Sequence, residues 1–249
     1  MMRRRVIGFT AFLSLALAAA LVVLPARWLT VLVPEKWPVA LVDAQGTVWN
    51  GTAALALGPS HNRRRLPDTL QWRWSFKNGP RLELSHPWLN GPVLLALTQG
   101  GLALSSRTLT LPASALATVD ARLAAVGPEG YLTLRWPALQ LKHVPPAEGT
   151  RLLEAEWRDA ASALTPIRPL GHYNMTLTAK GQGNELVLTT RQGPLMLEGK
   201  GTVDPRQGLD FTGTARADPN AGDRVSTALQ DVLAALGPRQ NNVTMLRLR

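Results

Sequence analysis

Residues 171–201 read GHYNMTLTAKGQGNELVLTTRQGPLMLEGKG, and this stretch decides the fold class. Apolar and polar residues alternate along residues 175–178, 186–189 and 195–198. Because successive side chains of a β-strand point to opposite faces, each of these segments is typical of a half-buried strand. Residues 181–184, Gly-Gln-Gly-Asn, separate the first two segments and have the composition of a tight hairpin turn. The stretch therefore predicts three consecutive antiparallel strands.

The same alternation continues on both sides of this stretch. It recurs at residues 81–85, 132–136, 139–142 and 209–212. Turn-like spacers rich in glycine, asparagine and proline occupy residues 77–80, 99–101 and 204–208. We therefore expect a mainly β fold, an antiparallel sheet that is curved or half-barrel-like, with only a few helices.

Two segments have helical spacing instead. Residues 114–126 begin with a serine suited to an N-cap, place apolar residues three or four positions apart, and stop at Gly127-Pro128. Residues 223–236 repeat this pattern and stop at Gly237-Pro238. Each helix is long enough to cover one face of a sheet.

The two helices mark an internal repeat. In both halves of the chain two strands precede the helix and one strand follows it, at an offset of about 102 to 110 residues. The repeat predicts two similar meander-plus-helix units, residues 35–144 and 145–249, joined near Pro145-Pro146. No long flexible linker separates them, which favours one continuous sheet over two separate domains.

The N-terminus predicts a membrane anchor. An uncharged apolar run from Val6 to Leu24 would form a helix of roughly 28 Å, close to the ~30 Å hydrocarbon core of a bilayer. A cleaved signal usually has a shorter apolar region, although residues 18–20, three alanines, imitate a cleavage site inside the run. Trp28 is placed as an interfacial aromatic. We expect residues 6–33 to form a retained single-pass anchor with its interfacial segment.

The charges near that run predict its orientation. Arg3, Arg4 and Arg5 precede it, so the positive-inside rule places residues 1–5 in the cytoplasm and the bulk of the chain in the periplasm. These arginines account for three of the formal net charges of +10, which leaves about +7 elsewhere. The topology and the lack of an aromatic-plus-basic motif argue against nucleic-acid binding.

Residues that carry chemistry are sparse. The chain has no cysteine, which excludes disulfides, thiolate nucleophiles and cysteine zinc sites. Its four histidines are scattered without metal-ligand spacing, and neither a nucleophile elbow nor a phosphate-binding glycine loop is present. The sequence predicts no catalytic residue, no metal site and no cofactor.

Tryptophan is the unusual component, with eight copies. Trp72 and Trp74 are spaced to share one face of a strand, which Phe76 extends. One interpretation is core filling, because a sheet of this size needs large apolar side chains. The other is an apolar trough for an acyl chain or an anchor for a protein partner.

Over its whole length the chain resembles the protein N family of the bacterial type II secretion system. The resemblance is carried by the short anchor, the Gly-Thr-Val-Trp-Asn-Gly stretch at 46–51, the Leu-x-Trp-x-Trp strand at 70–74, and the turn at 169–173. The glycine-rich strand at 193–201 and the helix end at 235–237 complete it. The motif positions are Gly46, Trp49, Gly51, Trp72, Trp74, Pro169, Gly171, Tyr173, Gly193, Gly199 and Gly201.

The resemblance implies a non-enzymatic accessory component of the secretion machinery in the inner membrane. Its partners would be inner-membrane platform proteins or the outer-membrane secretin, contacted through periplasmic surfaces such as exposed strand edges. The 46–51 stretch is also similar to AsmA-like and lipopolysaccharide-export proteins. That weaker similarity implies the alternative, a lipid-binding or lipid-transfer module with lipid in an apolar trough.

Overall fold

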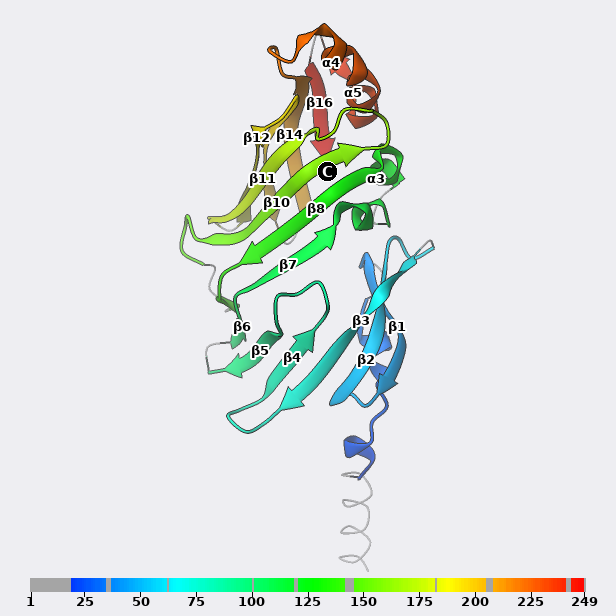
Figure 1. The fold of residues 1–249 in the computed structure, drawn as a ribbon. Helices are drawn as coiled ribbons and strands as arrows, with labels where there is room; N and C mark the ends of the chain where they lie inside the picture. Colours follow the sequence, from blue (N-terminus) through cyan, green and yellow to red (C-terminus); the bar gives the residue numbers. More distant parts are fainter. Residues whose placement is uncertain are drawn as a thin grey trace, which may run out of the picture. The chain divides into compact units, whose positions relative to one another are not determined.

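A computed structural model describes residues 19–34, 37–61, 63–99, 101–118, 121–141, 146–181, 183–204, 208–240 and 243–248 (Figure 1). The chain divides into two compact units, Met1–His86 and Pro87–Arg249. The division falls at residues 86/87, whereas the repeat predicted from the sequence has its join near residue 145. The duplication of 35–144 and 145–249 remains a prediction.

Unit 1 is built on four antiparallel strands. A short helix, α2 (Trp28–Leu32), precedes β1 (Val39–Gly46), β2 (Asn50–Leu57), β3 (Arg64–Ser75) and β4 (Arg81–Ser85). Each strand pairs with the next one along the chain, as in a meander (Figure 1). The small core of this unit is centred on Ala26, Ala53 and Trp72. Its turns at 47–50 and 76–80 lie at the same end of the strands as α2.

Unit 2 contains the longest sheet. Its first strands are β5 (Val93–Thr98) and β6 (Gly101–Leu104), and β6 also pairs with β9 (Leu139–Leu141). The remaining strands form a nine-stranded antiparallel sheet in the order β15-β16-β14-β13-β12-β11-β10-β8-β7. These strands are β7 (Arg107–Pro112), β8 (Pro128–Trp136), β10 (Arg151–Ser162), β11 (Gly171–Lys180), β12 (Gly183–Gln192), β13 (Leu195–Asp204), β14 (Gly208–Ala217), β15 (Arg239–Gln240) and β16 (Val243–Leu248).

The core of unit 2 lies between this sheet and two helices. Leu229, Val232 and Leu233 of the helical segment are almost fully buried, and they pack with sheet residues such as Tyr173 and Leu195. These three leucine and valine residues belong to the apolar stripe predicted from the 3.6-residue spacing. Burial of that stripe on one face of the sheet is the main hydrophobic contribution to this unit.

The predicted strands and turns agree well with the structure. The predicted mainly β, antiparallel class is confirmed, and the described residues of each alternating segment lie within a strand. In residues 171–201 the three expected strands are β11, β12 and the beginning of β13, in antiparallel register.

The structure differs from the two single α-helices that the sequence predicts. The described residues of the first segment form a 3-10 helix, η1 (Ala113–Thr118), and an α-helix, α3 (Ala121–Val126). At the end of η1 the Thr118 hydroxyl donates to the Ala115 carbonyl at 2.7 Å, a local bond that competes with a regular helix. The second segment forms α4 (Gly222–Ala228) and α5 (Gln230–Leu236), between which Leu229 still bonds to Val225.

Most of the predicted anchor lies outside the described residues. This applies to Arg3, Arg4, Arg5 and Val6, and to the rest of the apolar run up to residue 18. Within the described part of the chain, no helix has the length and apolar character needed to cross a bilayer. The single-pass anchor therefore stays a prediction.

Candidate functional site

The motif positions of unit 1 gather around the turn between β1 and β2. Gly46 and Gly51 face each other across this hairpin. Trp72, on the neighbouring strand β3, covers Gly51 so closely that a Cβ there would lie 2.5 Å from the Trp72 ring. The Trp72 indole donates to the carbonyls of Thr47 and Val48, each at 3.1 Å, and its side chain is only 4% exposed. Trp72 therefore holds the β1–β2 hairpin turn in place through these contacts and is a structural residue.

Three other aromatic residues, Trp49, Trp74 and Phe76, contact one another and are named here the aromatic cluster. Trp49, Trp74 and Phe76 have ring centroids 5.9 to 6.4 Å apart, with the Trp74 and Phe76 rings stacked. Phe76 is 59% exposed, and both tryptophans are half-buried. Trp72 and Trp74, two residues apart on one strand, thus differ sharply in environment. The aromatic cluster presents a surface to solvent that the core of unit 1 does not need.

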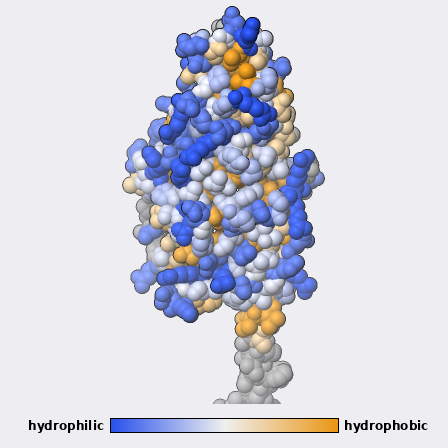
Figure 2. Space-filling view, in the orientation of Figure 1, coloured by the Kyte–Doolittle hydropathy of each residue, from blue (hydrophilic) through white to orange (hydrophobic). Residues whose placement is uncertain are grey.

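The aromatic cluster is tied to the described C-terminal part of the predicted anchor and its interfacial segment. The Trp49 indole donates to the Leu21 carbonyl at 2.8 Å, and the Leu24 carbonyl accepts from the backbone of Val48. Apolar side chains remain exposed along this segment, and Figure 2 shows their hydrophobic colour concentrated around α2. The most exposed are Leu21, Val22, Val23, Trp28 and Val31, the last at 81%.

The motif positions of unit 2 serve its core instead. Gly193 has φ +128°, and a Cβ on it would lie 2.3 Å from the Gly171 Cα. Tyr173 is 3% exposed and donates to the Leu195 carbonyl at 2.8 Å. Burial raises the pKa of Tyr173, which keeps its hydroxyl a donor. The turn that begins with Pro169 leads into this close packing of β11 against β13.

The last two motif glycines have a simple packing role. Gly199 and Gly201 of β13 pair in register with Gly213 and Phe211 of β14. A Cβ on Gly199 would lie 2.3 Å from the Phe211 ring, so the missing side chain makes room for that ring. The glycines of residues 193–201 therefore shape the sheet.

Only part of β1 offers backbone groups for pairing with a further strand. The Gly58 amide donates to the Pro38 carbonyl, so alternation along an antiparallel pair turns the backbone groups of Val39 and Leu41 outward. Farther along, a bulge follows Val42 and includes Asp43 with φ 53°, and the Ala26 amide already occupies the Gly46 carbonyl.

The ends of the nine-stranded sheet are protected in other ways. Residues 88–90 run along β7, with the Thr110 amide donating to the Trp88 carbonyl at 2.8 Å and the Asn90 amide to the Thr108 carbonyl at 2.9 Å. At the opposite end β15 has only two residues. Proteins avoid unwanted edge pairing by such protection. The two edge strands of this sheet are therefore poorly suited to binding a further strand.

Another surface of unit 2 is an open hollow of about 710 Å³, named here the arginine groove. It is formed where β7, β8, β9 and β10 approach one another. Its lining combines three arginines with a tryptophan, one glutamate and small polar residues. The lining residues are Asn90, Ser106, Arg107, Thr108, Arg135, Trp136, Pro137, Ala138, Leu139, Thr150, Arg151 and Glu154.

The arginines of the groove are positioned by contacts, but their positive charge is only partly balanced by nearby carboxylates. Arg107 donates to two backbone carbonyls, those of Pro92 and Ser106. Arg135 lies 3.5 Å from Glu156, a carboxylate that Arg158 approaches more closely, at 2.8 Å. The hydrogen bond from Arg158 is the main reason that the pKa of Glu156 lies below its ordinary value. Arg135 therefore shares its counter-ion with another arginine.

The third arginine of the groove is the most accessible. Arg151 has a 63% exposed side chain and contacts Glu154 at 3.7 Å, a loose pair of little strength. Three arginines thus face one carboxylate within the groove lining, which makes it a positive surface. Trp136 adds an aromatic wall, and its indole is fixed by donation to the Ser105 carbonyl at 3.0 Å.

The sequence did not reveal this groove. Its arginines come from three strands and are separated by up to 44 positions, so no local pattern unites them. The only signal was the Arg-Trp pair at 135–136, at the end of an alternating strand.

The described residues bring no reacting set of side chains together at any of these places. Groups of three or more histidines and carboxylates that could hold a metal ion do not occur in the part of the chain that the structure describes. His172 lies 3.8 Å from Asp159, and His86 is buried, which lowers its pKa.

Fold and surfaces together define a class of protein: a mainly β, two-unit chain whose candidate sites are surfaces for contact. A sequence model of the type II secretion system (T2SS) protein N family matches residues 38–247. The chain therefore belongs to this family, and the resemblance found from its motifs is confirmed. No curated protein and no solved structure matches the chain significantly.

Proposed function

We propose that the chain is a non-enzymatic accessory component of type II secretion, anchored in the inner membrane and acting through periplasmic protein contacts. Family membership supports involvement in type II secretion. The finer role rests on one observation, the arginine groove of unit 2. We infer that this groove receives an acidic segment of another secretion component, from the inner-membrane platform or from the secretin.

The chemistry of the groove favours a protein partner. Arginine and tryptophan are enriched among the residues that dominate binding energy at protein interfaces. Arg135 and Arg151 offer planar donors that suit carboxylates, and Arg107 extends the positive potential along β7. Charge complementarity of this kind also speeds the encounter of the partners.

A lipid-handling function has less support. It requires an apolar trough, and in unit 2 the buried apolar face of the nine-stranded sheet is already covered by Leu229, Val232 and Leu233 of the α4–α5 segment. The arginine groove, a hollow of about 710 Å³ in that unit, has three arginines in its lining. We therefore do not favour the AsmA-like alternative.

Site-specific crosslinking tests this proposal. A photoreactive amino acid replaces Ala138, an exposed residue of the groove lining, in the full-length chain in secreting cells. The matched control replaces Ala234, exposed on α5 outside the lining. We expect adducts with a secretion component from position 138 and few from position 234. Equal yields at both positions, or no adduct at position 138, would contradict the proposal.

A further inference from the structure

Beyond the groove, the aromatic cluster of unit 1 lacks a structural explanation. Trp72 already fills the core beneath the hairpin, while Phe76 keeps more than half of its surface exposed. Trp49 bonds to the Leu21 carbonyl, and the side chains of Leu21 and Val22 are exposed. Exposed apolar surface of this kind is costly in water unless something covers it. The cover must suit aromatic rings and aliphatic side chains at the same time.

The position of the aromatic cluster indicates what covers its exposed surface. Trp49 bonds to the carbonyl of Leu21, and Leu21 is part of the apolar run that ends at Leu24. Three residues of helix correspond to about 4.5 Å, so Trp49 is held within one helical turn of the end of that run. Where such a run spans a bilayer, this level is the headgroup layer, in which tryptophan rings are enriched.

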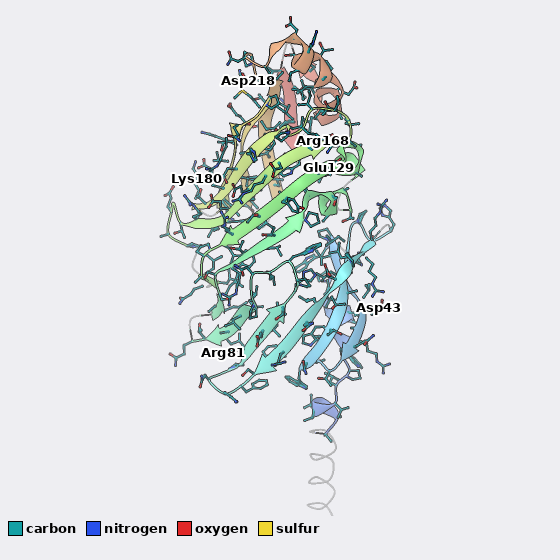
Figure 3. All side chains as sticks on the ribbon, in the orientation of Figure 1. Asp43, Arg81, Glu129, Arg168, Lys180 and Asp218 are labelled. Carbon is teal, nitrogen blue, oxygen red and sulfur yellow. The ribbon has the colours of Figure 1, made fainter. Side chains whose placement is uncertain are left out.

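Exposed basic side chains also favour contact with lipid headgroups. Arg27 precedes α2 next to exposed Trp28, and Lys77 and Arg81 flank the turn that follows Phe76 (Figure 3 labels Arg81). All three side chains are exposed. Basic residues close to a membrane surface are attracted to anionic lipid headgroups. Aromatic rings with basic side chains nearby, close to the end of the apolar run, match the chemistry of the headgroup layer.

We propose that Trp49, Trp74 and Phe76 form a second membrane contact, which rests in the headgroup layer of the periplasmic leaflet. This inference rests on the proposed function, because it requires the anchor of that proposal. With the contact in place, unit 1 is attached at two points, through its anchor and through the turns at 47–50 and 76–80. Two points of attachment hold the β1–β4 sheet at a defined orientation on the membrane.

A single spin label can test this contact, because the chain contains no cysteine. Asn78→Cys places a nitroxide at the turn beside Phe76 and leaves the aromatic cluster intact. Thr69→Cys places one on the exposed face of β3, about 20 Å farther along the strand. The full-length chain is reconstituted in vesicles of phosphatidylethanolamine and phosphatidylglycerol, and flotation of the vesicles checks membrane attachment.

The readout is the accessibility of each label to oxygen, which concentrates in the bilayer, and to a water-soluble nickel chelate. We expect the label at position 78 to favour oxygen and the label at 69 to favour nickel. Trp74→Ala combined with Phe76→Ala should shift the label at 78 toward nickel without loss of flotation.

The other outcomes separate this inference from the proposed function. A chain that floats while both labels favour nickel overturns the membrane contact alone. A label at 78 that is shielded only when other secretion components are added also overturns it and assigns the aromatic cluster to a protein partner. Failure to float overturns the anchored function, and the inference with it.

Discussion

Two tryptophans on one strand provide the sharpest test of how unit 1 is built. Trp72 and Trp74 are two residues apart on β3, yet of their two side chains it is that of Trp72 that belongs to the core and donates to the carbonyls of Thr47 and Val48. Trp74 contributes mainly to the aromatic cluster. Trp72→Ala should therefore destabilise unit 1 strongly, and Trp74→Ala should not.

The expected difference follows from burial. A tryptophan side chain buries roughly 150–250 Å², which at about 25 cal/mol per Å² corresponds to about 4–6 kcal/mol. Partial collapse of the cavity brings the usual cost of Trp→Ala in a core to about 3–5 kcal/mol. For Trp74 the loss is limited to its ring contacts, worth about 0.5–1.5 kcal/mol each. Trp74 has two such contacts, so its loss is about 1–3 kcal/mol in all, and the cost of Trp72→Ala should exceed that of Trp74→Ala by about 2 kcal/mol.

Hydrogen exchange read by mass spectrometry measures this difference within one unit. Peptides from β2 and β3 report on unit 1, and peptides from β13 and β14 serve as an internal reference in unit 2. A loss of about 4 kcal/mol accelerates exchange through opening of unit 1 by about a thousandfold. If Trp72→Ala does not fold, Trp72→Phe keeps most of the ring volume and should show an intermediate effect. Equal destabilisation by Trp72→Ala and Trp74→Ala, or a larger effect of Trp74→Ala, would refute the assignment of roles.

Three further predictions concern unit 2. Gly193→Ala should cost about 2–5 kcal/mol in denaturant unfolding, from positive φ and a backbone clash, whereas Gly208→Ala, with open space around it, should cost about 1–2 kcal/mol; equal costs would contradict this. Tyr173→Phe should cost about 1–3 kcal/mol in the same assay, because it leaves a buried carbonyl without its donor, and an unchanged midpoint would contradict it. A hydrogen bond from Arg168 lowers the pKa of Glu129 from its ordinary value, so this pair stabilises the folded chain above the unfolded-state pKa of the carboxyl, and the gain is lost as pH falls through the lower folded-state pKa (Figure 3). The Tm difference between wild type and Glu129→Gln should therefore shrink on acidification, and a constant difference would refute it.

The sequence was sufficient where structure depends on local pattern. Alternation placed β11, β12 and β13 correctly, because successive side chains of a strand point to opposite faces, and burial alternates in this way along β13. Glycine-rich spacers marked the turns for the same local reason, since positive φ is needed there. Helical spacing identified the buried stripe of α4 and α5, although not the break at Leu229.

The candidate sites depend on contacts between distant residues, which no local pattern encodes. Trp72 and Trp74 look alike in sequence, and only the packing of Gly51 from the neighbouring strand separates them. The arginine groove needs Arg107, Arg135 and Arg151 to converge from three strands. Sequence motifs did locate Trp49, but its bond to the Leu21 carbonyl is a tertiary feature.

The central claim is that the chain works by contact with other secretion components through the arginine groove. Its most direct test is affinity capture of the full-length chain from crosslinked envelopes of a secreting strain. Arg135→Glu with Arg151→Glu reverses the groove charge, and Arg216→Glu with Arg224→Glu makes the same change on exposed residues outside the groove lining. We predict that capture of secretion components falls at least tenfold for the groove variant, about 1.4 kcal/mol or more in binding, and stays near wild type for the control. Equal capture by both variants at equal abundance, or no secretion component captured by the wild type, would contradict the claim.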